Sequence, residues 1–234
     1  MSALLLDVDG TLLDIAPTPD AVVVPPQLTD ALRTLRPRLQ HALAVVSGRP
    51  VDELEALLAG GPYAFAGEHG AAIRHAPGEP LERPPLPSPP PAWLAEAERI
   101  VAAHPGALLE RKEKGFVIHY RASPDLGPLL RECLVQLTGG DNRFSILSAR
   151  KAWEVRPAGA DKGCAVRALM QRPPFQGRIP IFIGDDVTDR DGIAASIEAN
   201  GIGLMVPETF GTPTRVRAWL ARAAATHSDE WPGW

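Results

Sequence analysis

Short apolar runs of strand length constrain the fold of this chain more than any other feature. Leucines occupy positions 4–6, and LAVV at 43–46 and IPIFI at 179–183 form similar runs. Such runs are typical of strands buried on both faces of a parallel sheet. Helical patterns separate the runs, for example at 25–39, where Leu28 and Leu32 share a stripe. This β-α-β-α-β order predicts a doubly wound α/β fold.

A change of composition indicates an inserted module. The segment at 76–93 is rich in proline and predicts a semi-rigid linker, which we interpret as a hinge. Beyond it a helix and two strands occur twice, a pattern that predicts a small α+β module with helices on one sheet face. The α/β pattern then resumes near Gly159. We therefore expect a Rossmann-like core at 1–78 and 158–234 and an inserted domain at 79–157.

Composition argues against several classes of protein. The formal net charge of -4 disfavours a nucleic-acid binder with a basic surface. No apolar run approaches the ~18 residues of a membrane span, and Asp7 and Asp9 interrupt the first run, so we expect no signal peptide and no membrane partner. Cys133 and Cys164 lack metal-ligand spacing and are typical of reduced thiols. These features favour a cytoplasmic protein, which we expect to be a monomer with a loosely packed tail at 227–234.

Polar clusters follow the predicted strands. Asp7 and Asp9 lie two residues apart, so their side chains share a face at the end of the first strand. Ligands of open α/β sheets bind at the carboxyl ends of the strands. Three further clusters occupy corresponding places, namely Ser47-Gly48-Arg49, Lys162 at a helix start, and the acids of GDDVTD at 184–189. We expect all four clusters to converge.

The chemistry of these clusters is complementary. The carboxylates are Asp7, Asp9, Asp185, Asp186 and Asp189. They cannot all ionise side by side without a cation, and ligand sets of oxygen alone suit Mg²⁺. Ser47 and Lys162 offer a hydroxyl and an ammonium to a phosphoryl group. A carboxylate is able to act as the nucleophile in phosphoryl transfer, and a second carboxylic acid nearby can protonate the leaving oxygen and then activate water.

Four motifs in order, DVDGT, the Ser of VVSGR, the Lys of ADKG and GDDVTD, resemble those of the haloacid-dehalogenase superfamily of phosphohydrolases. The resemblance implies that Asp7 is the nucleophile and Asp9 the acid and base, so that water releases the phosphate quickly. It also implies that Ser47 and Lys162 hold the phosphate.

The same resemblance implies a magnesium site. Asp7, the backbone carbonyl of Asp9, and Asp185 would hold the ion. Asp189, or else Asp186, would support it through water. The expected metal residues are therefore Asp7, Asp9, Asp185 and Asp189.

Longer segments are similar to trehalose-6-phosphate phosphatases. These segments are DGTL followed by PTPDAVVVP, SGRPVDELEALL, GEHGA, LLERKEKGFVIHYR, WEVRPAGADKG and GDDVTDRD. The resemblance implies hydrolysis of trehalose 6-phosphate in trehalose biosynthesis, with a mobile cap that closes over the sugar.

Sugar hydroxyls require a dense set of hydrogen-bonding groups, and charged side chains give the stronger bonds. We expect sugar contacts from six residues of the insert, Glu110, Lys112, His119, Arg121, Lys151 and Glu154, and from three of the core, Arg49, Glu68 and His69. Lys112 and Lys114 compete for one of these positions.

Three other functions stay open from sequence. A related sugar phosphatase would act on mannosyl-3-phosphoglycerate or sucrose phosphate. A phosphomutase would hand the phosphate back instead of losing it to water. A non-catalytic sugar-phosphate-binding protein would tolerate loss of Asp7 or Asp9, and both are present.

Overall fold

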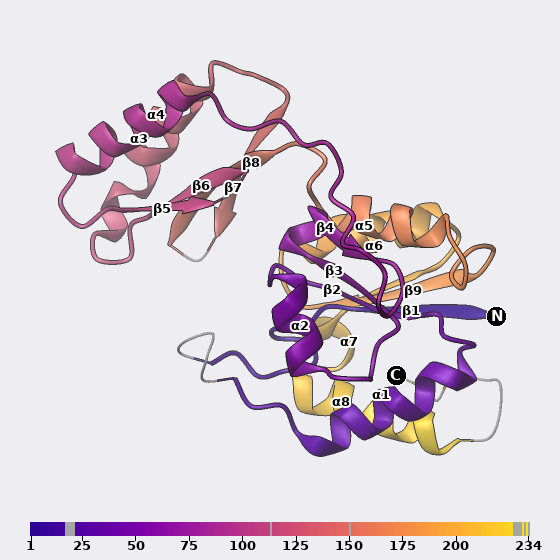
Figure 1. The fold of residues 1–234 in the computed structure, drawn as a ribbon. Helices are drawn as coiled ribbons and strands as arrows, with labels where there is room; N and C mark the ends of the chain where they lie inside the picture. Colours follow the sequence, from indigo (N-terminus) through magenta and orange to yellow (C-terminus); the bar gives the residue numbers. More distant parts are fainter. Residues whose placement is uncertain (17–21, 113, 150, 227–230, 232, 234) are drawn as a thin grey trace. The chain divides into compact units, whose positions relative to one another are not determined.

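The computed structural model describes residues 1–16, 22–112, 114–149 and 151–226, together with 231 and 233. The chain forms two compact units (Figure 1). The core unit consists of Met1–Pro84 and Asp161–Trp234, and the inserted unit is Pro85–Ala160. Both boundaries of the insert expected at 79–157 lie a few residues earlier in the sequence than the boundaries of this unit. Residues 17–21 of the PTPDAVVVP segment lie outside the described part.

A six-stranded sheet forms the centre of the core unit. Its strands are β1 (Ser2–Leu6), β2 (Leu43–Val46), β3 (Ala64–Gly67), β4 (Ala72–Arg74), β9 (Ile179–Gly184) and β10 (Ile202–Met205). Their order is β10-β9-β1-β2-β3-β4, and all neighbours are parallel except β3 and β4. The doubly wound α/β prediction is confirmed.

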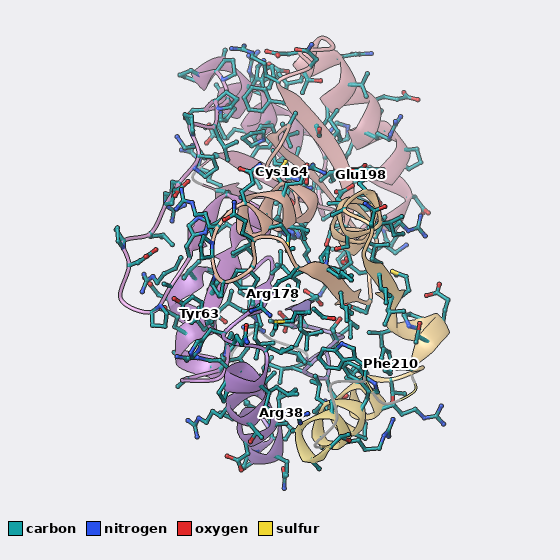
Figure 2. All side chains as sticks on the ribbon, turned by 90° about the vertical axis from the view of Figure 1, so that its right-hand side faces the viewer. Arg38, Tyr63, Cys164, Arg178, Glu198 and Phe210 are labelled. Carbon is teal, nitrogen blue, oxygen red and sulfur yellow. The ribbon has the colours of Figure 1, made fainter. Side chains whose placement is uncertain are left out.

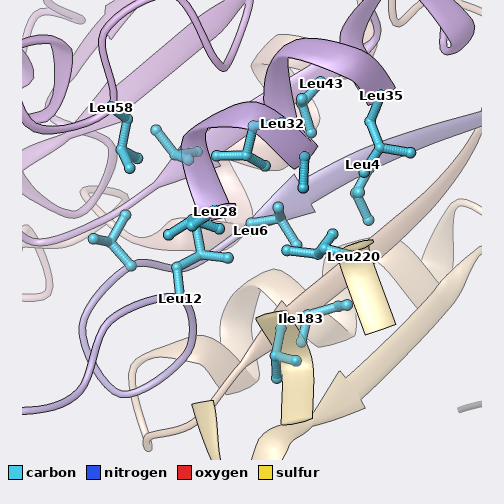
Figure 3. Packing of buried hydrophobic residues seen from close by; sticks show 14 of the residues in the cluster. Leu4, Leu6, Leu12, Leu28, Leu32, Leu35, Leu43, Leu58, Ile183 and Leu220 are labelled. Carbon is cyan, nitrogen blue, oxygen red and sulfur yellow. The ribbon is translucent and has the colours of Figure 1, made fainter. Parts of the chain in front are cut away.

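Helices cover both faces of this sheet because the strand side chains alternate. Leu4 and Leu6 point to the face that carries α1 (Pro26–Arg38), α2 (Val51–Leu57) and α8 (Pro213–Ala225), where Leu32 and Leu220 pack with them (Figure 3). Leu5 points to the opposite face, which carries α5 (Lys162–Met170) and α6 (Asp189–Glu198). The strands are therefore runs of consecutive apolar residues because the side chains on both of their faces are covered by helices. A short helix, α7 (Val206–Thr209), follows β10.

The end of the chain packs more closely than the sequence predicts. Arg38 of α1 donates to the carbonyl of Ala224 in α8 over 3.0 Å, which joins the two helices (Figure 2). The ring of Trp231 stacks on Trp219, with centroids 5.2 Å apart. The prediction of a loose tail is therefore wrong for Trp231, because a buried indole of α8 offers it an aromatic surface. Residues 227–230, 232 and 234 lie outside the described part.

The inserted unit is a separate α+β module. Its elements are α3 (Pro91–Ala103), β5 (Leu108–Lys112), β6 (Gly115–His119), α4 (Gly127–Thr138), β7 (Phe144–Ala149) and β8 (Ala152–Pro157). The strands form an antiparallel sheet in the order β5-β6-β8-β7. Phe116 and Ile118 of β6 pack with Leu130 of α4 in a hydrophobic core of its own. Both helices pack on this face, as the sequence predicts.

Among the described residues, no helix combines the length and the apolar character that a membrane crossing demands.

Candidate active site

The carboxyl ends of three parallel strands carry the predicted polar side chains. Asp7 directly follows β1, Ser47 follows β2, and Asp185 follows β9. The register pairs Leu6 of β1 with a residue near the end of each neighbouring strand. The three polar residues therefore come to one edge of the sheet, where parallel α/β sheets bind ligands.

Lys162 is the positive centre of this edge. It is the first residue of α5, and Asp161 caps that helix by accepting the backbone N–H of Cys164 over 2.7 Å. The Lys162 Nζ donates to Asp7 Oδ1 over 2.7 Å and to Asp189 Oδ1 over 2.6 Å. All three side chains are buried. Burial alone would lower the pKa of Lys162, but the charges of Asp7 and Asp189 outweigh it and raise the pKa.

Asp189 organises the loop that follows β9. Its Oδ2 accepts the backbone N–H groups of Asp185 over 2.9 Å and Asp186 over 3.0 Å. Gly184 leaves the room for this arrangement, since a Cβ at that position would overlap the Asp189 carboxylate. Asp189 therefore accepts hydrogen bonds on both of its carboxylate oxygens and fixes the position of the Asp185 backbone.

Three carboxylates share this space with a single lysine. One oxygen each of Asp7, Asp185 and Asp189 lies within 4.8 Å of the others. The second oxygen of Asp7, Oδ2, is buried and accepts no hydrogen bond from the described residues. Burial, together with the charge of Asp7, raises the pKa of Asp185 and of Asp189 to about 7. A surplus of buried negative charge and an oxygen without a donor both fit a bound cation.

Asp186, the alternative support for the ion, faces other partners. Its Oδ1 accepts the backbone N–H and the hydroxyl of Thr188, each over 2.7 Å. Burial would raise the pKa of Asp186, but the hydrogen bonds from Thr188 and the charge of Lys162 act against it, and the pKa is lowered. The turn itself uses this carboxylate, which lies outside the acidic triad of Asp7, Asp185 and Asp189.

Asp9 does not point at the acidic triad but at Arg49. Arg49 Nε donates to Asp9 Oδ2 over 2.6 Å, and Arg49 Nη2 donates to Asp9 Oδ1 over 2.8 Å. Arg49 Nη1 donates to Glu53, in the first turn of α2. Hydrogen bonding to Asp9 is the main reason that the pKa of Arg49 is raised. The structure thus brings together one expected catalytic residue and one expected sugar ligand.

Glu68 and His69 form a strained turn after β3. Both have positive φ, 53° and 57°, a conformation that is uncommon outside glycine. The Glu68 carboxylate accepts hydrogen bonds from both terminal nitrogens of Arg83, each over 2.8 Å. The ring of His69 lies so close to Gly48 that a Cβ there would be 2.7 Å from Nε2. The turn packs against the loop that carries Ser47 and Arg49.

The expected cap residues fall into two groups. Glu110, Lys112, His119 and Glu154 lie on the sheet face opposite the inserted unit's core, as the register of β5, β6 and β8 requires. There the His119 ring nitrogen Nε2 and Glu110 Oε2 are 2.7 Å apart, and Lys112 donates to Glu154 over 3.0 Å. Arg121 and Lys151 are exposed and lie outside the strands. Lys114 lies in a turn and donates to Ser88 over 3.2 Å, so Lys112 is the lysine on the sheet face.

Residues 5–211 match the family model described as trehalose-phosphatase. The chain belongs to the trehalose-phosphatase family. Two curated relatives agree with this assignment. Trehalose-6-phosphate phosphatase of Escherichia coli is 36% identical over 220 residues, covering 93% of this chain and 80% of the relative. A probable trehalose-phosphate phosphatase of Sinorhizobium fredii is 41% identical over 214 residues, covering 87% and 77%.

The fold of this family member also resembles a solved structure. The C-terminal domain of trehalose-6-phosphate phosphatase from C. albicans has a TM-score of 0.75 at 22% identity, covering 96% of this chain and 92% of that one. This similarity concerns the fold, in which an α/β core and a smaller antiparallel-sheet unit occur together.

Three polar residues that lie beside predicted ones, two in the core unit and one in the inserted unit, are not indicated by the sequence analysis. Thr11 is fully buried and its hydroxyl lies 3.4 Å from Asp185 Oδ1. Glu53 pairs with Arg49. Arg156 is a buried arginine two residues after Glu154, on the same sheet face. The alternation that indicates Glu154 also points to Arg156, and the four-residue spacing of Arg49 and Glu53 is a local signal for their ion pair.

Proposed function

We propose that this protein hydrolyses trehalose 6-phosphate to trehalose and phosphate through an aspartyl-phosphate intermediate. The observation that carries the proposal is the environment of the Asp7 carboxylate in a member of the trehalose-phosphatase family. One of its oxygens is held by Lys162, and the other is buried with no hydrogen-bond donor among the described residues. A carboxylate fixed in this way has a lone pair available for attack on phosphorus.

The proposed reaction has two steps. In the first, Asp7 attacks phosphorus, the bond from phosphorus to the sugar oxygen breaks, and Asp9 gives that oxygen a proton. In the second, water attacks the aspartyl-phosphate, Asp9 takes the proton of the water, and the bond from phosphorus to Asp7 breaks. Ser47 and Lys162 would hold the phosphate, because both lie at the edge that carries Asp7. The products are trehalose and inorganic phosphate.

The proposed cofactor is Mg²⁺. The acidic triad of Asp7, Asp185 and Asp189 suits a divalent cation held by oxygen, and Mg²⁺ shares such sites with substrate phosphates. Asp7 and Asp185 would hold it directly together with the backbone carbonyl of Asp9. Asp189 would support it, since Lys162 and two backbone N–H groups already bind its oxygens. When bound, the ion would neutralise charge that develops on the transferred phosphoryl group.

The inserted unit is proposed to act as the cap that selects the sugar. Four charged side chains, Glu110, Lys112, His119 and Glu154, lie on one sheet face and already pair with each other. Such pairs present both donors and acceptors, as sugar hydroxyls require. Arg121 and Lys151 remain proposed contacts from the ends of strands. Arg49, Glu68 and His69 are the contacts expected from the core. Arg49 binds the acidic Asp9, and Glu68 binds the basic Arg83.

Phosphate release from a panel of sugar phosphates tests the proposal. We expect a large preference for trehalose 6-phosphate over sucrose phosphate and mannosyl-3-phosphoglycerate, and loss of release in EDTA. Asp7→Asn should lower kcat by about 10³-fold or more. Asp14→Asn is the matched control, because the Asp14 side chain is 68% exposed and accepts its hydrogen bond from Arg217, 3.0 Å away. Broad and weak release would discard the sugar assignment, and near-native activity of Asp7→Asn would discard the mechanism.

A further inference from the structure

The contact between Asp9 and Arg49 carries an inference about how the proton is moved. We infer that Arg49 is a positioning residue, which holds the Asp9 carboxylate in the orientation required for proton transfer and does not bind the sugar. The inference rests on the proposed function, because that function makes Asp9 the acid and base.

All three nitrogens of the Arg49 guanidinium are engaged with carboxylates. Nε and Nη2 bind the two oxygens of Asp9 over 2.6 and 2.8 Å, and Nη1 binds Glu53. A fork of two parallel hydrogen bonds fixes the plane of the carboxylate as well as its distance. Glu53 anchors the opposite end of the guanidinium. These bonds use three of the five guanidinium N–H groups, and the two that remain belong to a side chain that is only 11% exposed, which leaves a sugar hydroxyl little access to Arg49.

The backbone that carries Arg49 is also fixed. Its N–H donates to the hydroxyl of Ser47 over 3.3 Å, and its carbonyl accepts the N–H of Glu68 over 3.0 Å. The Arg49 side chain is 11% exposed, whereas that of Asp9 is 36% exposed. The arginine is therefore the more rigid partner, and it holds a more accessible carboxylate. Groups that orient a reacting side chain in this way are themselves usually held by packing and hydrogen bonds.

The two hydrogen bonds have different consequences in the two steps. In the second step Asp9 accepts a proton from water, and the arginine fork holds it as a carboxylate in a defined plane. In the first step Asp9 carries the proton that goes to the sugar oxygen, so one of the two bonds from Arg49 has to be released. Glu53 keeps the guanidinium beside Asp9 during this exchange. A misplacement of ~1 Å at a reacting group costs about 10²-fold in rate, which makes such positioning valuable.

Arg49→Lys tests the inference, because lysine keeps the charge but cannot form the fork. With trehalose 6-phosphate, which leaves as a poorly acidic alcohol, we expect kcat to fall by about 10- to 100-fold while KM hardly changes. With p-nitrophenyl phosphate, whose leaving group departs without a proton, only the second step is slowed. We therefore expect a burst of one p-nitrophenol per enzyme, followed by slow turnover.

Two further variants separate positioning from general damage. In an Asp9→Asn background, Arg49→Lys should cost almost nothing more, because the residue through which it acts is already impaired. Arg74→Lys is the matched control, since Arg74 pairs with Glu55 over 2.7 Å and with Asp52 over 3.2 Å on the same helix α2. It should show no burst and a native kcat. Arg49→Gln replaces Arg49→Lys if the lysine variant does not fold.

The outcomes distinguish this inference from the proposed function. A raised KM for trehalose 6-phosphate with native kcat and no burst would make Arg49 a sugar ligand and overturn the inference alone. Fully multiplicative effects of Asp9→Asn and Arg49→Lys would overturn it as well. If the native chain releases phosphate from neither substrate, the proposed function fails and the inference falls with it.

Discussion

Lys162 and Asp189 form an ion pair of 2.6 Å in which both side chains are buried. The same ammonium also binds Asp7 over 2.7 Å. One cation therefore compensates two carboxylates in a region of low dielectric. The costly change in such a group is the removal of one partner, because it leaves a buried charge without compensation.

Lys162→Met should destabilise the protein as well as inactivate it. It leaves Asp7 and Asp189 without their shared cation, and we expect the free energy of unfolding to fall by about 3–5 kcal/mol. Urea unfolding measures the change. Arg99→Met is the control, because both side chains of the ion pair between Arg99 and Glu96 are exposed, Arg99 by 76% and Glu96 by 37%. That variant should cost only about 0–1 kcal/mol, and an equal loss in both variants would contradict the prediction.

Gly10→Ala should disturb the acidic triad. Gly10 has a φ of +83°, and a Cβ there would overlap the Asp185 carboxylate. Gly78 has a similar φ of +78° with nothing within 4 Å of its added Cβ, so Gly78→Ala reports backbone strain alone. We expect Gly10→Ala to lose at least about 1 kcal/mol more stability than Gly78→Ala in urea unfolding. Equal losses would mean that Asp185 moves aside freely.

Mg²⁺ should stabilise the folded protein. A cation that binds the triad only in the folded state adds about 2.7 kcal/mol at a concentration of 100 times its Kd. Thermal unfolding should therefore show a Tm that rises with Mg²⁺ and returns after EDTA. Asp185→Asn should abolish the increase, whereas Asp30→Asn, a surface change paired with Arg33, should keep it. If Mg²⁺ raised the Tm of Asp185→Asn as much as that of the native protein, the cation would have to bind elsewhere.

His75 should make stability fall under mildly acidic conditions. Its side chain is buried, with Nε2 3.5 Å from Glu82. Burial, helped by the charge of Arg172, lowers its pKa below the ordinary 6.5, against the opposite pull of Glu82 and Glu79. The unfolded chain therefore binds the proton more readily, so the stability due to neutral His75 is present above pH 6.5 and is lost as the pH falls toward the folded-state pKa.

His75→Gln should flatten this dependence. We expect the free energy of unfolding of the native protein minus that of the variant to rise with pH up to the ordinary 6.5, because only the native protein carries the contribution of His75. Urea unfolding at several pH values measures both slopes. Identical slopes in the two proteins would mean that another group binds the proton.

The core fold followed from local patterns in the sequence. Leu4 to Leu6 are apolar on consecutive positions because helices cover both faces of β1, and the sequence carries that requirement directly. The position of Trp231 did not follow, since its partner Trp219 belongs to another element and no periodicity connects the two. Tertiary contacts of single side chains near a chain end leave no local pattern.

The site was predictable only as far as strand ends determine it. Asp7, Asp185 and Lys162 come together because each begins or ends an element of the sheet edge. The pairing of Asp9 with Arg49, 40 residues away, was not predictable. Arg49 was expected at the sugar and lies against Asp9, because rotamers and a facing residue on α2 decide where a long side chain ends.

The insertion also has a consequence for synthesis of the chain. The inserted unit is one continuous segment with its own hydrophobic core, whereas β1 of the core unit lies between β2 and β9, which comes from the far side of the insertion. During translation the inserted unit is complete before β9 has been made. Until then one edge of the apolar strand β1 has no neighbour, and unpaired edges of this kind attract other chains. The nascent protein is therefore most exposed to misassembly at β1, where protection by a chaperone would matter most.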